Sequence, residues 1–122
     1  MEYKISIDKV VDIYNTLNSN KNSADGRVFC RTSARVIGSW IDKSKVSEDN
    51  SFEVCYAAAT MAYYRKALKD NAVAVDLKAG DISVTDNSEK TVEYAKKLYE
   101  DALQAISHLL KSRRFAFVVT EG

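Results

Sequence analysis

Proline is absent from the sequence, and glycine occurs only four times. Proline breaks helices and glycine weakens them, so this shortage favours long helices with few sharp breaks. Long apolar runs are missing as well, since the longest stretch without a charged residue covers residues 54–64. A membrane-spanning helix needs about 20 apolar residues, so we expect no membrane crossing.

Length and composition point to one folded domain. At 122 residues the chain has room for a single hydrophobic core. Hydrophobic residues make up 46% and charged residues 29%, which is the balance of a globular protein. The first residues include Glu2 and Lys4 instead of a basic start followed by an apolar block, so they do not resemble a secretory signal. We therefore expect one cytosolic, helical domain over residues 1–122.

Residues that could carry catalysis are scarce. The single histidine, His108, lies in a predicted helix beside two leucines, which favours a structural or surface role over that of a general base. Cys30 and Cys55 are far apart within apolar helical patterns, so we expect buried thiols without a disulfide or a zinc site. A glycine-rich phosphate loop is missing too. We expect no enzyme activity, no cofactor and no metal.

Apolar residues recur at helical spacing in four stretches of the chain. The expected helices cover residues 6–18, residue 24 or 27 to 43, residues 51–71, and a start among residues 86–88 to about residue 111. Ser6 is suited to cap the first helix. The third helix would place Phe52, Cys55 and Tyr56 on its packed face. The fold class is therefore mainly α, a four-helix, bundle-like domain.

Between the third and fourth helices the apolar period changes from helical to alternating. Apolar residues alternate with small or polar ones on both sides of the turn-forming sequence KAGD (residues 78–81), at Val73, Val75, Leu77, Ile82 and Val84. This pattern predicts an inserted β-hairpin over about residues 73–84 with Gly80 in the turn. Residues 114–120 form another β-prone run, which predicts a short C-terminal strand. That strand has no later strand to pair with, so it must pair backward or with another chain.

Overall charge gives no attraction to nucleic acid, because 18 Lys and Arg are matched by 17 Asp and Glu. One local pattern differs from this balance. Arg27, Arg31 and Arg35 recur every four residues along one side of the second predicted helix. The row could contact phosphates, although basic rows are most often solvated faces or salt-bridge partners.

Three segments between residues 52 and 110 carry a resemblance to a known family. They are an alanine- and tyrosine-rich helix (CYAAATMAYYR, residues 55–65), the hairpin sequence KAGDISV (residues 78–84), and a long helix with AKKLY (residues 95–99) and Ala102-Leu103. In these segments, which span about half of the chain, the sequence resembles the small head-tail connector proteins of tailed bacteriophages and prophages, also called adaptor or head-completion proteins.

The resemblance implies a non-catalytic subunit, in the virion or the bacterial host cytoplasm, that forms a ring joining portal and tail. Its partners would be copies of itself, the portal and tail-completion proteins, and DNA in the channel. Strand edges in the hairpin and tail would contact neighbouring subunits. The expected contact residues are Val73, Val75, Lys78, Gly80, Asp81, Ile82, Val84, Arg114, Phe115 and Phe117. The possible DNA-facing residues are Arg27, Arg31 and Arg35. The alternative is a small nucleic-acid-binding or regulatory helical domain that uses the same arginines.

Overall fold

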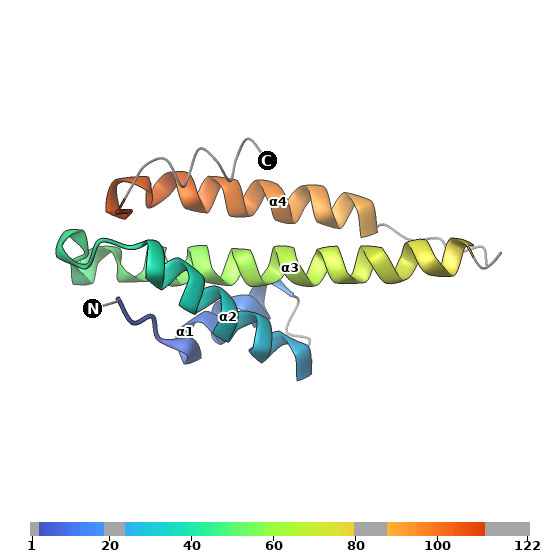
Figure 1. Ribbon diagram of the computed structural model, residues 1–122, viewed down its shortest axis with the longest axis horizontal. Coiled ribbons are helices and arrows are strands. Elements are labelled where there is room, and N and C mark those ends of the chain that lie inside the picture. The colour runs from blue at the N-terminus through green and yellow to red at the C-terminus, as the bar shows by residue number, and fades with distance from the viewer. Residues whose placement is uncertain (1–2, 19–23, 80–87, 112–122) are drawn as a thin grey trace.

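The computed structural model describes residues 3–18, 24–79 and 88–111, which form four α-helices and three short 3-10 helices (Figure 1). The α-helices are α1 (Ile7–Leu17), α2 (Ala24–Trp40), α3 (Ser51–Ala79) and α4 (Ser88–Ala105). The 3-10 helices are η1 (Lys43–Lys45), η2 (Glu48–Asn50) and η3 (Ser107–Leu109). The prediction of a mainly α fold is therefore confirmed.

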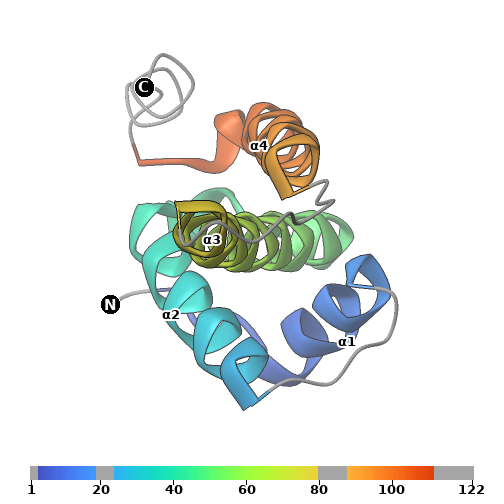
Figure 2. The same ribbon diagram turned by 90° about the vertical axis from the view of Figure 1, so that its right-hand side faces the viewer.

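Helix α3 lies at the centre of the fold, with α4 on one side and α1 and α2 on the other (Figure 2). Residues 57–62 of α3 are all buried. Successive residues of an α-helix point about 100° apart, so a run of consecutive buried residues means that the helix is enclosed on every side. Most of this run is alanine, whose small side chain lets the neighbouring helices come close to α3.

Helix α4 packs on α3 through one face. Its buried residues Ala95, Tyr99 and Ala102 are three or four positions apart, as the sequence predicts for an amphipathic helix. The ring of Tyr99 lies 5.9 Å from the ring of Tyr64 on α3, measured between centroids. Tilted aromatic pairs at this separation are favourable, so the two rings help to hold α4 on α3.

The N-terminal residues are fixed against α2. Ser6 caps α1 as predicted, because its Oγ accepts a hydrogen bond from the backbone N–H of Lys9 at 3.4 Å. Before this cap the chain passes so close to α2 that a Cβ on Gly38 would lie 2.6 Å from the carbonyl oxygen of Tyr3. Glycine at position 38 therefore sets where the residues ahead of α1 can lie.

A short antiparallel contact joins the chain after α2 to the chain after α4. The backbone N–H of Asp42 donates to the carbonyl oxygen of Leu109, and that of Lys111 donates to Trp40, both at 2.8 Å. Ile41 and Leu110 face each other in this bridge, and both are buried. The contact closes the end of the fold where α3 begins.

Two helices end earlier than the sequence predicts. α2 stops at Trp40 instead of residue 43, and α4 stops at Ala105 instead of about residue 111. After α4 the chain tightens into η3, in which the N–H of Leu109 donates to the carbonyl oxygen of Ile106 at 2.8 Å. This turn buries Leu109 by folding it back toward α2, whereas the helical spacing alone suggested continued helix.

The predicted β-hairpin is wrong, because α3 continues through its first strand to Ala79. Extending an existing helix needs no new nucleation, and the alanines among residues 72–79 are strong helix formers. An isolated two-stranded hairpin is only marginally stable in water. Short alternating runs such as Val73 to Leu77 are therefore a weak strand signal beside a long helix.

The other strand predictions involve residues beyond those described. The second half of the hairpin, with Ile82 and Val84, and the C-terminal strand over residues 114–120 lie outside the described residues. Within residues 3–18, 24–79 and 88–111, extended pairing is limited to the isolated bridge between Ile41 and Leu110.

We expect Gly38→Ala to lower the free energy of unfolding by about 1–3 kcal/mol, because the added methyl group meets the backbone of Tyr3. The loss should exceed the gain of about 1 kcal/mol that alanine usually brings to a helix. Urea unfolding, followed by circular dichroism, measures the change in the free energy of unfolding. Thr32→Ala on the exposed face of the same helix is the control and should change stability by less than about 0.5 kcal/mol. Equal stability of the two variants would contradict the close approach.

Removing either of two buried hydroxyl groups should change the free energy of unfolding, but in opposite directions. Thr60 Oγ1 donates to the carbonyl oxygen of Ala57 at 2.8 Å, whereas Ser33 Oγ has no hydrogen-bond partner among the described residues. Ser33→Ala should raise the free energy of unfolding by about 1 kcal/mol, and Thr60→Ala should lower it by about 1 kcal/mol. Thermal unfolding of both variants beside the parent chain tests this, and shifts of the same sign would refute it.

Candidate functional site

The predicted arginine row divides into two parts in the structure. Arg27 Nη2 lies 3.4 Å from Asp8 Oδ1, so this residue links α2 to α1. Both side chains are largely exposed, and such surface pairs contribute little to stability. Arg31 and Arg35 instead line a pocket between α2 and the residues ahead of α1. The structure therefore retains two of the three arginines as candidates for binding.

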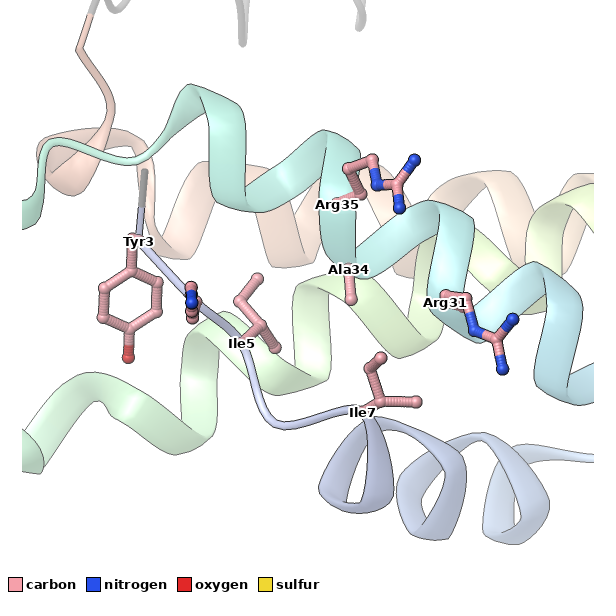
Figure 3. A pocket seen from close by; sticks show the side chains of 7 residues that line it. Tyr3, Ile5, Ile7, Arg31, Ala34 and Arg35 are labelled. Atoms are coloured by element: carbon pink, nitrogen blue, oxygen red, sulfur yellow. The ribbon is translucent and has the colours of Figure 1, made fainter. Parts of the chain in front are cut away.

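The pocket has a volume of about 370 Å³ and is open to solvent. Arg31 and Arg35 leave α2 one turn apart, and their guanidinium groups extend in the same direction (Figure 3). Ile5, Ile7 and Ala34 form its apolar part, while Tyr3 lies at one end (Figure 3). The site thus combines an apolar floor with exposed cations.

Lys4 is the third cation of this pocket, and we call Lys4, Arg31 and Arg35 the cationic cluster. Among the described residues, none of the three forms an ion pair with a carboxylate. Guanidinium groups bind phosphate through two parallel hydrogen bonds, and a lysine ammonium adds a point charge. The arrangement is therefore suited to an anion such as a phosphodiester.

Sequence reasoning missed Lys4 because no predicted element contained it. The close approach at Gly38 and the packing of Tyr3 and Ile5 against the core bring the residues ahead of Ser6 alongside α2. The four-residue spacing of the arginines, in contrast, is a local property of one helix and is visible in the sequence. A glycine in the middle of a predicted helix was the available signal that another segment packs there.

The other predicted site residues lie at the margins of the described chain. Val73, Val75 and Lys78 belong to the last turns of α3, so they are on a helix and not on a strand. The remaining predicted contact residues lie outside the described residues: Gly80, Asp81, Ile82, Val84, Arg114, Phe115 and Phe117. Their proposed contacts with neighbouring subunits stay predictions.

The candidate nucleophiles and the histidine do not come together in one site. Burial raises the pKa of the Cys30 thiol to about 11, and burial also raises the pKa of Cys55. A raised pKa keeps a thiol neutral and unreactive near pH 7. His108 is exposed on η3. In the described part of the chain no three His, Cys, Asp or Glu side chains are grouped to hold a metal ion.

Comparisons with known proteins add no identification. Neither a family model, nor a curated protein, nor a solved structure matches the chain. None of the described helices is both long and apolar enough to cross a bilayer.

We expect the double variant Arg31→Glu/Arg35→Glu to bind short duplex DNA about tenfold more weakly at low salt than the parent chain. The dependence of log binding constant on log salt should also flatten by about 2 units, since about one ion is released per phosphate contact. Fluorescence anisotropy across a salt series measures both quantities. Lys90→Glu/Lys97→Glu on the exposed side of α4 makes the same change in net charge and is the control. Equal losses in the two double variants would show a general charge effect and no site.

Proposed function

We propose that the chain is a non-enzymatic structural protein of a tailed bacteriophage or prophage. In this role it is a head-tail connector subunit that assembles into a ring between the portal and the tail. The proposal rests on the resemblance of the two helical segments, residues 55–65 and 95–103, and on the surfaces that the fold presents.

The resemblance falls on residues that form the packed centre of the fold. The segment CYAAATMAYYR, residues 55–65, contains the part of α3 that is enclosed on every side. The matching residues of the last long helix include Ala95, Tyr99, Ala102 and Leu103, all buried. The likeness therefore concerns residues that determine how α3 and α4 pack. Proteins that share a fold are expected to be similar at such residues.

The single observation that carries the proposal is the pairing of a cationic cluster with exposed apolar side chains elsewhere on the molecule. A channel subunit needs one surface for DNA phosphates and another for its neighbours. Lys4, Arg31 and Arg35 supply the first. Large hydrophobic side chains exposed on α2 and α3 are available for the second: Val28, Phe52 and Leu68. Aromatic residues are enriched in subunit interfaces.

A second candidate function is a monomeric nucleic-acid-binding or regulatory domain. The cationic cluster favours it, because cations without carboxylate partners in the described chain are available to phosphates. The exposed apolar residues do not contribute to this function. The two candidates differ in whether the protein binds copies of itself or a portal.

Sedimentation velocity of the full chain across a wide concentration range, alone and with a purified portal protein, tests the proposal. We expect oligomers that grow with concentration, or co-sedimentation with the portal. Electron microscopy of the largest species should then show rings. A chain that stays monomeric, ignores the portal and binds DNA in a salt-sensitive way would contradict the connector and support the second candidate.

A further inference from the structure

Phe52 separates two hollows on the surface of the fold. One hollow, of about 210 Å³, lies between α3 and α4 and is lined by Tyr56, Leu98 and Ala102. The other, of about 250 Å³, lies between α1 and α3 and is lined by Ile13 and Cys55. Phe52 borders both, and we call this region the Phe52 surface.

The ring of Phe52 is far more exposed than sequence reasoning predicted. The residue is 63% exposed, and its ring is stacked on that of Tyr56 with 6.3 Å between ring centroids. An apolar cavity of about 150 Å³ is known to accommodate benzene, so each hollow has room for one phenyl ring. Apolar groups placed on both sides of Phe52 would cover it from water.

Carboxylates surround these hollows. Glu53 and Asp101 border the hollow beside α4, and Asp12 borders the one beside α1; all three are exposed. Lys9 is the one cation among the lining residues of the two hollows. A ligand that fits here therefore has aromatic side chains next to positive charges.

The chain contains such a sequence immediately after its last described residue. Residues 112–122 read SRRFAFVVTEG, with Arg113 and Arg114 followed by Phe115 and Phe117. The two phenyl rings are separated by one small residue, so an extended peptide presents both to the same surface. Phe115 and Phe117 follow Lys111 by four and six residues, so an extended chain carries them at most about 14 and 22 Å beyond it, far enough to reach a molecule in contact. Residues 113–117 thus supply two phenyl rings for two hollows, and two positive charges for the carboxylates that border them.

The position where this segment leaves the fold argues for binding in a second copy. The Lys111 N–H donates to the carbonyl oxygen of Trp40, which holds the chain on the α2 side of α3. The Phe52 surface lies where α3 meets α1 and α4, and no residue of α2 or of residues 107–111 lines either hollow. The tail therefore leaves the fold from a surface other than the one that carries the two hollows.

The geometry points to the Phe52 surface as the binding site for residues 113–117 of a second copy of this chain. Phe115 and Phe117 occupy the two hollows beside Phe52, and Arg113 and Arg114 pair with Glu53 and Asp101. A contact between two different surfaces is head-to-tail, so it propagates and closes into a ring when the rotation allows. This inference rests on the proposed function and names the contact by which subunits join.

The test uses two full-length variants that each lose one half of the contact. Phe52→Asp removes the receiving surface, and Phe115→Ser/Phe117→Ser removes the inserted rings. Phe52 is exposed, so its replacement leaves the buried core intact. Each variant alone should self-associate at least about tenfold more weakly than the parent chain in sedimentation velocity. Tyr94→Asp, which alters an equally exposed ring on α4, is the matched control and should assemble like the parent.

Mixing the two variants gives the decisive measurement. Phe52→Asp still carries an intact tail and the tail variant still carries an intact Phe52 surface, so a mixture should form 1:1 dimers and nothing larger. Parent-like oligomers of Phe52→Asp, or a mixture that stays monomeric, would overturn the inference. If the parent chain itself never associates and ignores the portal, the proposed function fails. If the parent associates but the Phe52→Asp variant does so equally well, only this inference fails.

Discussion

The enclosure of α3 on every side is the constraint on which the rest of the structure depends. Residues 57–62 leave no face of the helix for water, so α1, α2 and α4 must all be present for the centre to be dry. Small alanine side chains let these helices approach closely, and close packing tolerates little change in volume. α2 is therefore held at a fixed position, and with it Arg31 and Arg35. The geometry of the cationic cluster is a consequence of how α3 is surrounded.

Much of the helical fold follows from local sequence. Ser6 is an N-cap in both prediction and structure, and the buried face of α4 has the predicted spacing. The end of α3 could not be predicted in this way. Over a run as short as residues 73–77 the apolar pattern is also compatible with a helix, because Val73 and Leu77 are four positions apart, and the choice depends on whether a helix already precedes the run. The end of α4 depends on a backbone contact with Trp40, which is distant in sequence.

The functional surfaces were predictable only where they belong to one helix. The four-residue spacing of Arg31 and Arg35 is enough by itself to place both on one side of α2. Lys4 joins them through the close approach at Gly38, a tertiary contact that helical periodicity does not contain. Phe52 fits the apolar period of α3, yet it lies in the first turn, where the neighbouring helices leave it 63% exposed. Periodicity identifies a face of a helix but not how far along it the neighbours extend.

Near-neutral charge has a specific consequence for association of this chain with itself. With a net charge of +1, copies brought together do not accumulate the long-range repulsion that opposes assembly of highly charged proteins. Short-range contacts then decide which surfaces meet. The cations of Lys4, Arg31 and Arg35 belong to the α2 side, whereas Glu53 and Asp101 border the groove between α3 and α4. This separation disfavours contacts between like surfaces of two copies and favours contacts between unlike ones. Unlike contacts are the kind that generate rings, so the charge distribution is compatible with the head-to-tail assembly proposed above.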